Sequence, residues 1–259
     1  MSDILTGIDA RGVATVTLNR PELHNAFNDS VIAELTAIFH RLGEDPAVRV
    51  VLLRGNGKSF SAGGDLNWMR RMASYDFAQN QADAMGLAGM LRTLNDLPKP
   101  TLAVVHGNCF AGAVGLVSAC DIAIAAEGVQ FALTEVRLGL IPATIAPYVV
   151  AAMGARACRR YFLTAERFGV DEAYRLGLVH EVAAAEALEA LAGTLTGQLL
   201  AGGPQAVTAA KALIPLVDRP IDDALVAETA TRIAQARAGV EAREGLASFF
   251  DKRKPGWAP

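Results

Sequence analysis

"TLAVVHGNCFAGAVGLVSACDIAIAA" (residues 101–126) holds two apolar runs separated by a segment of small residues. The first run, 101–107, and the last, 121–126, are short and apolar, which favours buried strands. The small residues between them, 108–120, predict a turn that opens a helix. Strand, helix and strand in this order are typical of an α/β fold.

The same alternation extends along the first half of the chain, and strand–strand–helix units recur. We expect strands at 13–19 and 48–54, a helix from a cap at 28–30 to Gly43, and a mostly helical segment at 66–97. The expected helix after 28–30 carries its apolar residues at helical spacing: Val31, Ile32, Leu35, Ile38, Phe39 and Leu42.

From Thr144 onward nearly every segment is expected to be helical. Residues 171–182 predict an Asp-capped turn of helix closed by Gly177 and followed by a short strand, and 221–250 predict one long helix. No linker rich in Pro, Gly or Ser divides the chain. We therefore expect a core over 1–199 and a helical C-terminal region over 200–259.

Composition excludes several classes of protein. The 259 residues are 52% hydrophobic and 20% charged with a net charge of −3, which argues against disorder and against a nucleic-acid partner. The most apolar stretches are too short for a membrane span or are broken by Pro142 and Pro147. The first ten residues have no signal-peptide pattern and carry two Asp, so we expect a cytoplasmic protein without a membrane partner.

Cysteine and histidine spacing indicates neither a metal site nor a disulfide framework. Cys109, Cys120 and Cys158 lie in apolar surroundings and are expected to be buried thiols. The four histidines share no ligand spacing, so we expect no metal.

Two small-residue turns each follow an apolar strand and open a helix. The first is "SFSAGGDL" (59–66), and the second is "GNCFAGAVG" (107–115). Each is consistent with ordinary chain reversal or with close packing of a helix on a sheet. Together they could also bring two backbone N–H groups to one place, where paired donors stabilise an oxyanion that develops on a carbonyl.

Five motifs in order resemble the enoyl-CoA hydratase/isomerase, or crotonase, superfamily, and the resemblance runs from about residue 12 to 257. The motifs are "HNAFND" (24–29), "FSAGGDL" (60–66), "GNCFAGAVGLVSACDIAIAA" (107–126), "LTEVRLGLIP" (133–142) and "EGLASFFDKRKPGW" (244–257). The resemblance implies a crotonase-like spiral of repeated ββα units with a helical C-terminal trimerisation region. It also implies a homotrimer or homohexamer that acts on acyl-CoA thioesters, with coenzyme A as part of the substrate and no other cofactor.

Matching positions assign roles to named residues. The resemblance implies that the N–H groups of Ala62 and Gly112 form the oxyanion hole and that Glu135 is the catalytic acid/base. It further implies coenzyme A binding by the first glycine turn and by two C-terminal positions: Ala62, Gly63, Gly64, Asp65, Leu66, Phe249 and Lys252.

One family position departs from the pattern. Family hydratases use two glutamates, and here Gly115 stands where the first is expected. One carboxylate in an apolar site can still exchange a proton with carbon or with water. The replacement of the family "GGG" by "ATI" (143–145) indicates a differently shaped acyl pocket.

Three hypotheses about function follow. The leading one is an enoyl-CoA hydratase that acts on a 2-enoyl-CoA, because "VRLGLIPATIAPYVV" (136–150) resembles the bacterial branch that hydrates 3-methylglutaconyl-CoA and related branched substrates. The second is a Δ3,Δ2-enoyl-CoA isomerase that uses the same Glu135, and the third is a non-catalytic acyl-CoA-binding homologue. Arg70 and Arg71 are candidates for binding a second carboxylate on the substrate, although such a pair on a polar helix is usually a solvated face.

Overall fold

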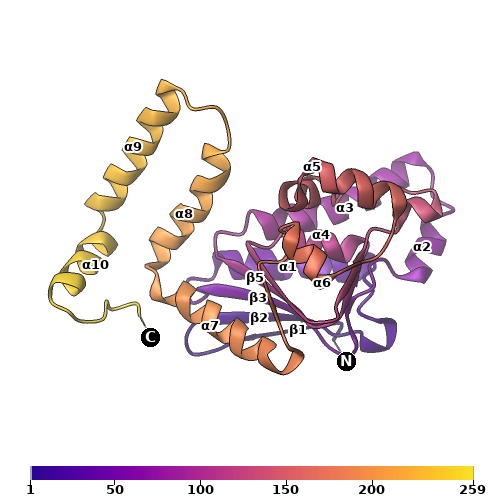
Figure 1. Cartoon of the computed structure of the whole chain (residues 1–259), viewed down its shortest axis with the longest axis horizontal. Helices are drawn as coiled ribbons and strands as arrows, with labels where there is room; N and C mark the ends of the chain where they lie inside the picture. Colours follow the sequence, from indigo (N-terminus) through magenta and orange to yellow (C-terminus); the bar gives the residue numbers. More distant parts are fainter. Residues whose placement is uncertain (1, 259) are drawn as a thin grey trace.

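The computed structural model describes residues 2–258 and shows an α/β body from which a helical arm extends (Figure 1). The larger sheet has six strands, in which the first two are antiparallel and the rest are parallel. In spatial order they are β1 (Ile4–Ile8), β2 (Val13–Leu18), β3 (Val50–Gly55), β5 (Thr101–Val105), β7 (Ile122–Ala126) and β10 (Glu181–Ala183).

A second, smaller sheet was not expected from the sequence. Its strands, in spatial order, are β4 (Ser59–Ser61), β6 (Asn108–Phe110), β8 (Gln130–Ala132) and β9 (Phe168–Gly169). The first three run parallel to one another, and β9 is antiparallel to β8. Strands of two or three residues are too short for a period-two pattern to be visible in the sequence.

The two sheets arise from one repeated unit. In each unit the first strand belongs to the larger sheet, the second strand belongs to the smaller sheet, and a helical segment follows. The units are β3–β4 with α2 (Leu66–Met72) and α3 (Phe77–Asn95), β5–β6 with α4 (Gly112–Ser118), and β7–β8 with the 3-10 helix η2 (Glu135–Leu138). The expected strand–strand–helix repeat is therefore confirmed.

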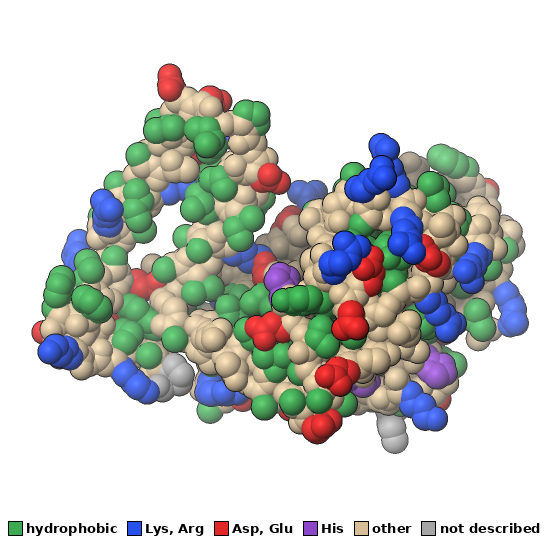
Figure 2. Space-filling model, in the orientation of Figure 1, with side chains coloured by type: hydrophobic (Ala, Val, Ile, Leu, Met, Phe, Trp, Pro, Cys, Tyr) green, Lys and Arg blue, Asp and Glu red, His purple; other side chains and the backbone are tan. Residues whose placement is uncertain are grey.

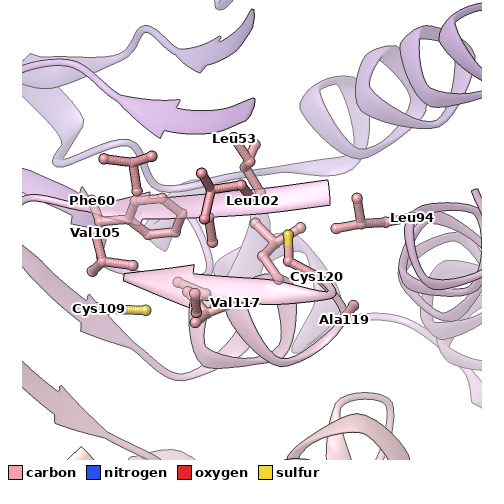
Figure 3. Close-up of a cluster of buried hydrophobic side chains, with 14 of the residues drawn as sticks. Leu53, Phe60, Leu94, Leu102, Val105, Cys109, Val117, Ala119 and Cys120 are labelled. Atoms are coloured by element: carbon pink, nitrogen blue, oxygen red, sulfur yellow. The ribbon is translucent and has the colours of Figure 1, made fainter. Parts of the chain in front are cut away.

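The hydrophobic core lies between the sheets and the helices that cover them. Helix α1 (Asp29–Glu44) is capped by Asn28, whose side chain accepts from the Val31 N–H, and all six apolar residues expected on its inner face are buried. Figure 3 shows side chains of β3, β4, β5 and α4 meeting in this core, with Cys109 and Cys120 among them. All three cysteines are free and buried, as expected.

The C-terminal half is mostly helical, but two details differ from expectation. Gly239 is in an extended conformation and divides the expected helix 221–250 in two. Gly169 rather than Asp171 caps the short helix, because that helix begins where β9 ends. The remaining elements are η1 (Pro21–Leu23), α5 (Ala146–Thr164), α6 (Val170–Arg175), η3 (Ala185–Ala187), α7 (Leu188–Ala201), α8 (Pro204–Val217), α9 (Asp223–Ala238) and α10 (Val240–Phe250).

Helices α8, α9 and α10 form the arm, and the chain then returns to the body beside α7 (Figure 1). The Trp257 indole N–H donates to the Ala201 carbonyl at 3.1 Å, and Arg49 donates to the Trp257 carbonyl at 3.1 Å. These contacts attach the arm to the body at its base. Among the described helices, none combines the length and the apolar character needed to cross a bilayer.

Candidate active site

Three turns that carry the expected site residues lie at one edge of the smaller sheet. Strands β4, β6 and β8 are parallel, so their carboxyl ends share an edge. After these strands come the turn 62–64, the turn 111–112 and Glu135. The tertiary structure therefore brings together the two small-residue turns and the glutamate of the sequence analysis.

Contacts between the turns are close enough to require glycine. Gly63 has a φ of +88°, and a Cβ at this position would lie 2.9 Å from the Phe110 carbonyl oxygen and 3.0 Å from the Ala111 Cβ. A side chain at Gly63 would be strained and would also push the two turns apart.

Backbone hydrogen bonds correct one expected role. Within "AGGD" (62–65), the only N–H among the described residues that has no acceptor is that of Gly64. The expectation that Ala62 contributes the oxyanion donor is wrong, because its N–H is already used inside the protein. The N–H groups of Ala62, Gly63 and Asp65 donate respectively to the His24 carbonyl at 2.9 Å, the Ser61 hydroxyl at 3.2 Å and the Phe27 carbonyl at 3.0 Å.

Gly112 presents the second free N–H, because no acceptor for it lies among residues 2–258. It is the first residue of α4 and follows Ala111, which has a φ of 50° and a ψ of −125°. Such a backbone conformation costs a non-glycine residue about 1–3 kcal/mol and is typical of functional turns. The Phe27 ring packs against Gly112, so a Cβ there would lie 2.7 Å from Phe27 Cζ.

Glu135 combines burial with an unused oxygen. Its Oε2 is buried and has no hydrogen-bond partner among the described residues. Burial raises the pKa of the Glu135 carboxyl above its ordinary value, and a hydrogen bond from its own backbone N–H opposes the shift less strongly. A carboxyl whose pKa is raised in this way is better suited to both take up and release a proton than a solvated glutamate.

A residue at the start of α5 occupies the space beside Gly115, where the first family glutamate was expected. Gly115 is buried on α4, and the Ile145 side chain at the start of α5 packs directly against it. Helix α4 (Gly112–Ser118) contains no acidic residue, so Glu135 on η2 is the one acid of this site that the sequence analysis named.

Asp65 caps helix α2 at this edge of the smaller sheet and pairs with Arg20. Its carboxylate accepts from the Asn67 and Trp68 N–H groups at the start of α2 and forms an ion pair with Arg20 at 3.0 Å. Burial opposes ionisation, but these hydrogen bonds and Arg20 outweigh it and lower the pKa of Asp65. The neighbouring Leu66 side chain is exposed.

Phe249 and Lys252 are not brought to this edge within one chain. Phe249 lies on α10, and Figure 1 shows α10 at the end of the molecule opposite α2. Arg71 forms an ion pair with Asp29 at 2.6 Å, and Arg70 donates to Asn67 at 3.1 Å. Both arginines are exposed on α2.

Sequence reasoning did not identify Phe27 or Ile145 as parts of the site, or Gly64 as the free donor. Phe27 lies in the quoted motif "HNAFND" (24–29), and Ile145 lies in "ATI" (143–145), but their contacts with Gly112 and Gly115 join segments far apart in the chain. Only the substitution of "GGG" by "ATI" gave a signal that this region differs.

Comparisons with known proteins agree with this architecture. Residues 9–259 match the family described as enoyl-CoA hydratase/isomerase. The chain is 31% identical to the crotonyl-CoA hydratase of Syntrophomonas wolfei over 248 residues, 93% of each chain. The crystal structure of an enoyl-CoA hydratase from Shewanella pealeana has 44% sequence identity and a TM-score of 0.95, and the match covers 99% of this chain and 96% of that one. Pseudomonas aeruginosa AtuE is 37% identical with a TM-score of 0.95 over the whole of both chains.

The matches span nearly the full length of this chain, and the crotonase-fold expectation is confirmed by them and by the ββα repeat. This protein is a member of the enoyl-CoA hydratase/isomerase, or crotonase, family.

Proposed function

We propose that this protein is an enoyl-CoA hydratase that adds water across the C2=C3 double bond of a 2-enoyl-CoA thioester. The observation that carries the proposal is the buried, unpartnered Oε2 of Glu135, three residues after Ala132, whose carbonyl accepts the N–H of Ala111 next to Gly112. The relatives named as hydratases support the same reaction class.

The N–H groups of Gly64 and Gly112 would hold the thioester oxygen in this reaction. When a nucleophile bonds to C3, negative charge moves through C2 onto that oxygen and gives an enolate. Two backbone donors fixed in a water-poor site stabilise this charge, and loss of one such donor typically costs about 10²–10³-fold in rate. The assignment uses the two N–H groups that the protein itself leaves free.

Glu135 would carry the proton. The ionised carboxylate removes a proton from water as the water oxygen bonds to C3, and the resulting carboxylic acid gives that proton to C2 of the enolate. The sum is addition of H and OH across the double bond, with Glu135 returned to its starting form. A carboxyl whose pKa is raised by burial exchanges a proton in both directions more readily than one at its ordinary value.

Coenzyme A would bind along "AGGD" (62–65), with the arm of a neighbouring protomer contributing Phe249 and Lys252. Three observations support a homo-oligomer such as a trimer or hexamer. Helix α10 is distant from α2 within one chain, Phe249 and Phe250 are 76% and 74% exposed, and Figure 2 shows hydrophobic side chains along both sides of the arm. Exposed apolar surface of this extent typically marks a protein interface.

The acyl group is proposed to be branched, with 3-methylglutaconyl-CoA as the leading candidate. This rests on the resemblance of residues 136–150 to that branch of the family. Arg70 is the candidate partner for a second substrate carboxylate, since its only described polar contact is with the neutral Asn67 side chain. Arg71 is the weaker candidate because Asp29 already pairs with it.

A second function is favoured by Gly115. A site with one acid can move a double bond, because the same carboxylate takes a proton from one carbon and returns it to another. A Δ3,Δ2-enoyl-CoA isomerase therefore needs Glu135 and the two donors but no acid at position 115.

Product analysis in ¹⁸O-labelled water distinguishes the two reactions. Purified protein is incubated with crotonyl-CoA, 3-methylglutaconyl-CoA or a 3-enoyl-CoA, beside the Glu135→Gln variant. A hydratase incorporates the label into a 3-hydroxyacyl product and loses this activity in the variant, whereas an isomerase moves the 3-enoyl double bond without label. Binding without turnover of any of the three substrates would instead identify a non-catalytic acyl-CoA-binding protein.

A further inference from the structure

Gly115 and Ile145 occupy a single side-chain space between α4 and α5. A Cβ added to Gly115 would lie 2.3 Å from Ile145 Cγ2 and 2.7 Å from Ile145 Cβ. Both distances are shorter than any real Cβ contact, and Ile145 is only 1% exposed. The volume beside Gly115 is therefore filled with hydrocarbon.

The Ile145 side chain cannot easily withdraw from this space. Its carbonyl accepts the N–H groups of Tyr148 and Val149 at 3.1 Å each, which holds residue 145 at the first turn of α5. Val149 is completely buried, so α5 is anchored against the body one turn later. Even alanine at position 115 would require α4 and α5 to separate.

This filled space adjoins the proposed active site. Gly112 and Gly115 are three residues apart on α4 and so project from the same helix face. Gly112 presents one of the two free N–H groups, and the Ala111 N–H donates to the Ala132 carbonyl, three residues before Glu135. A side chain at 115 would thus extend from the helix face that serves the same site as Glu135.

We propose that Ile145 is the residue that restricts this site to one acid: by filling the side-chain space of position 115 it excludes a second carboxylate from α4. The inference rests on the proposed function, because it concerns the acid/base chemistry of the same site. Gly115 and Ile145 then act as a matched pair, and replacing the glycine alone cannot restore a second acid. Ile145 determines the reaction chemistry by occupying space and is not itself a proton donor or acceptor.

The distances predict which change at 145 makes room. With glycine at 145, the nearest remaining atom to a Cβ at 115 is the Cα of residue 145 at 3.6 Å, an ordinary contact. With alanine at 145, the Cβ of that residue remains at 2.7 Å, which is still too close. Ile145→Gly should therefore accept a side chain at 115, whereas Ile145→Ala should not.

Stability measurements test the pairing without reference to activity. Gly115→Ala, Ile145→Gly, Ile145→Ala and the two double variants are compared by urea unfolding. We expect Gly115→Ala to lower the denaturation midpoint in the wild-type and Ile145→Ala backgrounds but to leave it unchanged or raise it in the Ile145→Gly background. Equal effects of Gly115→Ala in all three backgrounds would overturn the inference.

Activity measurements then test the chemistry. Gly115→Glu is introduced into the Ile145→Gly and Ile145→Ala backgrounds, and hydration of crotonyl-CoA is followed at the thioester absorbance. We expect Gly115→Glu with Ile145→Gly to hydrate at least about tenfold faster than Ile145→Gly alone, a modest part of the roughly 10²–10⁴-fold that a positioned acid or base supplies. We also expect the pH–rate profile of this double variant to gain a second ionisation. The Gly115→Glu, Ile145→Ala double variant should show neither the faster hydration nor the second ionisation.

Failure of this inference is distinguishable from failure of the proposed function. Exchange of the C2 protons of 3-hydroxybutyryl-CoA, the hydration product of crotonyl-CoA, with deuterated solvent is measured by mass spectrometry. Removal of a C2 proton from this compound gives the enolate and requires Glu135 but no acid at 115. Glu135-dependent exchange in the wild type without a gain in the Gly115→Glu, Ile145→Gly variant would overturn only the role of Ile145. Absence of both exchange and turnover in the wild type would overturn the proposed function itself.

Discussion

The backbone N–H of Ala111 donates to the carbonyl of Ala132 at 2.8 Å, and this bond joins the two segments that carry the proposed catalytic groups. On one side of it the chain turns into α4 and presents the Gly112 N–H. On the other side it leaves β8 and reaches Glu135 three residues later. This hydrogen bond thereby holds the Gly112 N–H, the proposed charge-stabilising group, close to Glu135, the proposed proton carrier.

Turnover should fall on the acidic side at a pH above the ordinary range of a glutamate. Glu135 must be ionised to accept a proton, and burial raises its pKa, so protonation removes the active form earlier than for a solvated glutamate. The measurement is kcat/KM for the better substrate between pH 4 and 9, with Glu135→Asp as the conservative comparison. An acidic limb at or below the ordinary glutamate pKa of 4.5 would contradict the burial argument.

Glu135→Gln should be more stable than the wild type at neutral pH, by on the order of 1 kcal/mol. Because the folded pKa of Glu135 lies above its unfolded value, the carboxyl favours folding below about pH 4.5, and this contribution is lost as the pH rises through the folded pKa. Urea unfolding at pH 4 and pH 7 should show the advantage of the variant only at pH 7. A variant that is less stable than the wild type at pH 7 would show that Oε2 has a partner in solution.

Gly112→Ala should lose at least about tenfold in kcat/KM and about 1–3 kcal/mol in stability, because its Cβ would meet the Phe27 ring at 2.7 Å. Gly64→Ala should retain most activity, since its Cβ would lie 3.5 Å from Trp68 and the N–H would remain. Gly193→Ala is the control, because nothing lies within 4 Å of a Cβ there. Steady-state kinetics and urea unfolding check all three variants. Equal losses at 64 and 112 would contradict the difference in available space, because both variants keep their backbone N–H.

Asp65→Ala should destabilise the protein by about 3 kcal/mol, because it removes the α2 cap and leaves Arg20 without its buried partner. Asp222→Ala removes an exposed cap from α9 and should cost only about 1 kcal/mol. The lowered pKa of Asp65 means that its contribution is present above about pH 3.8 and is lost as the pH falls through the folded pKa. Comparable losses in the two variants would contradict the role of the ion pair.

Phe249→Ser combined with Phe250→Ser should reduce the molar mass in solution from that of an oligomer toward that of one chain. These rings are among the most exposed apolar side chains of the arm, and polar replacements remove the apolar area that a neighbouring protomer would cover. Sedimentation equilibrium measures the mass, and Phe77→Ser, at an equally exposed position on α3, is the matched control. An unchanged molar mass in the double variant would show that these two rings of the arm are not needed for the interface between protomers.

The elements predicted well from the sequence are those with a clear local hydrophobic pattern and clear capping or turn residues. Helix α1 ends within one residue of its expected end, because its buried face and its Asn28 cap are both local signals. Strands β2, β3, β5 and β7 of the larger sheet were predicted for a similar reason, since each is an apolar run bounded by turn residues. Strand β1 was not predicted, because four of its five residues are exposed and it has no apolar run. The smaller sheet was missed because β4, β6, β8 and β9 contribute only two or three residues each.

The sequence by itself determined the family, the repeated ββα plan and the identity of the remaining acid, because motifs such as "LTEVRLGLIP" (133–142) carry residue type and order. Only the tertiary structure decided which amide is free, since the Ala62 N–H is used by His24 and the Gly64 N–H is not. It also decided that the space beside Gly115 belongs to Ile145. Hydrogen-bond partners and shared volume are relations between distant segments, and they exist only after the chain has folded.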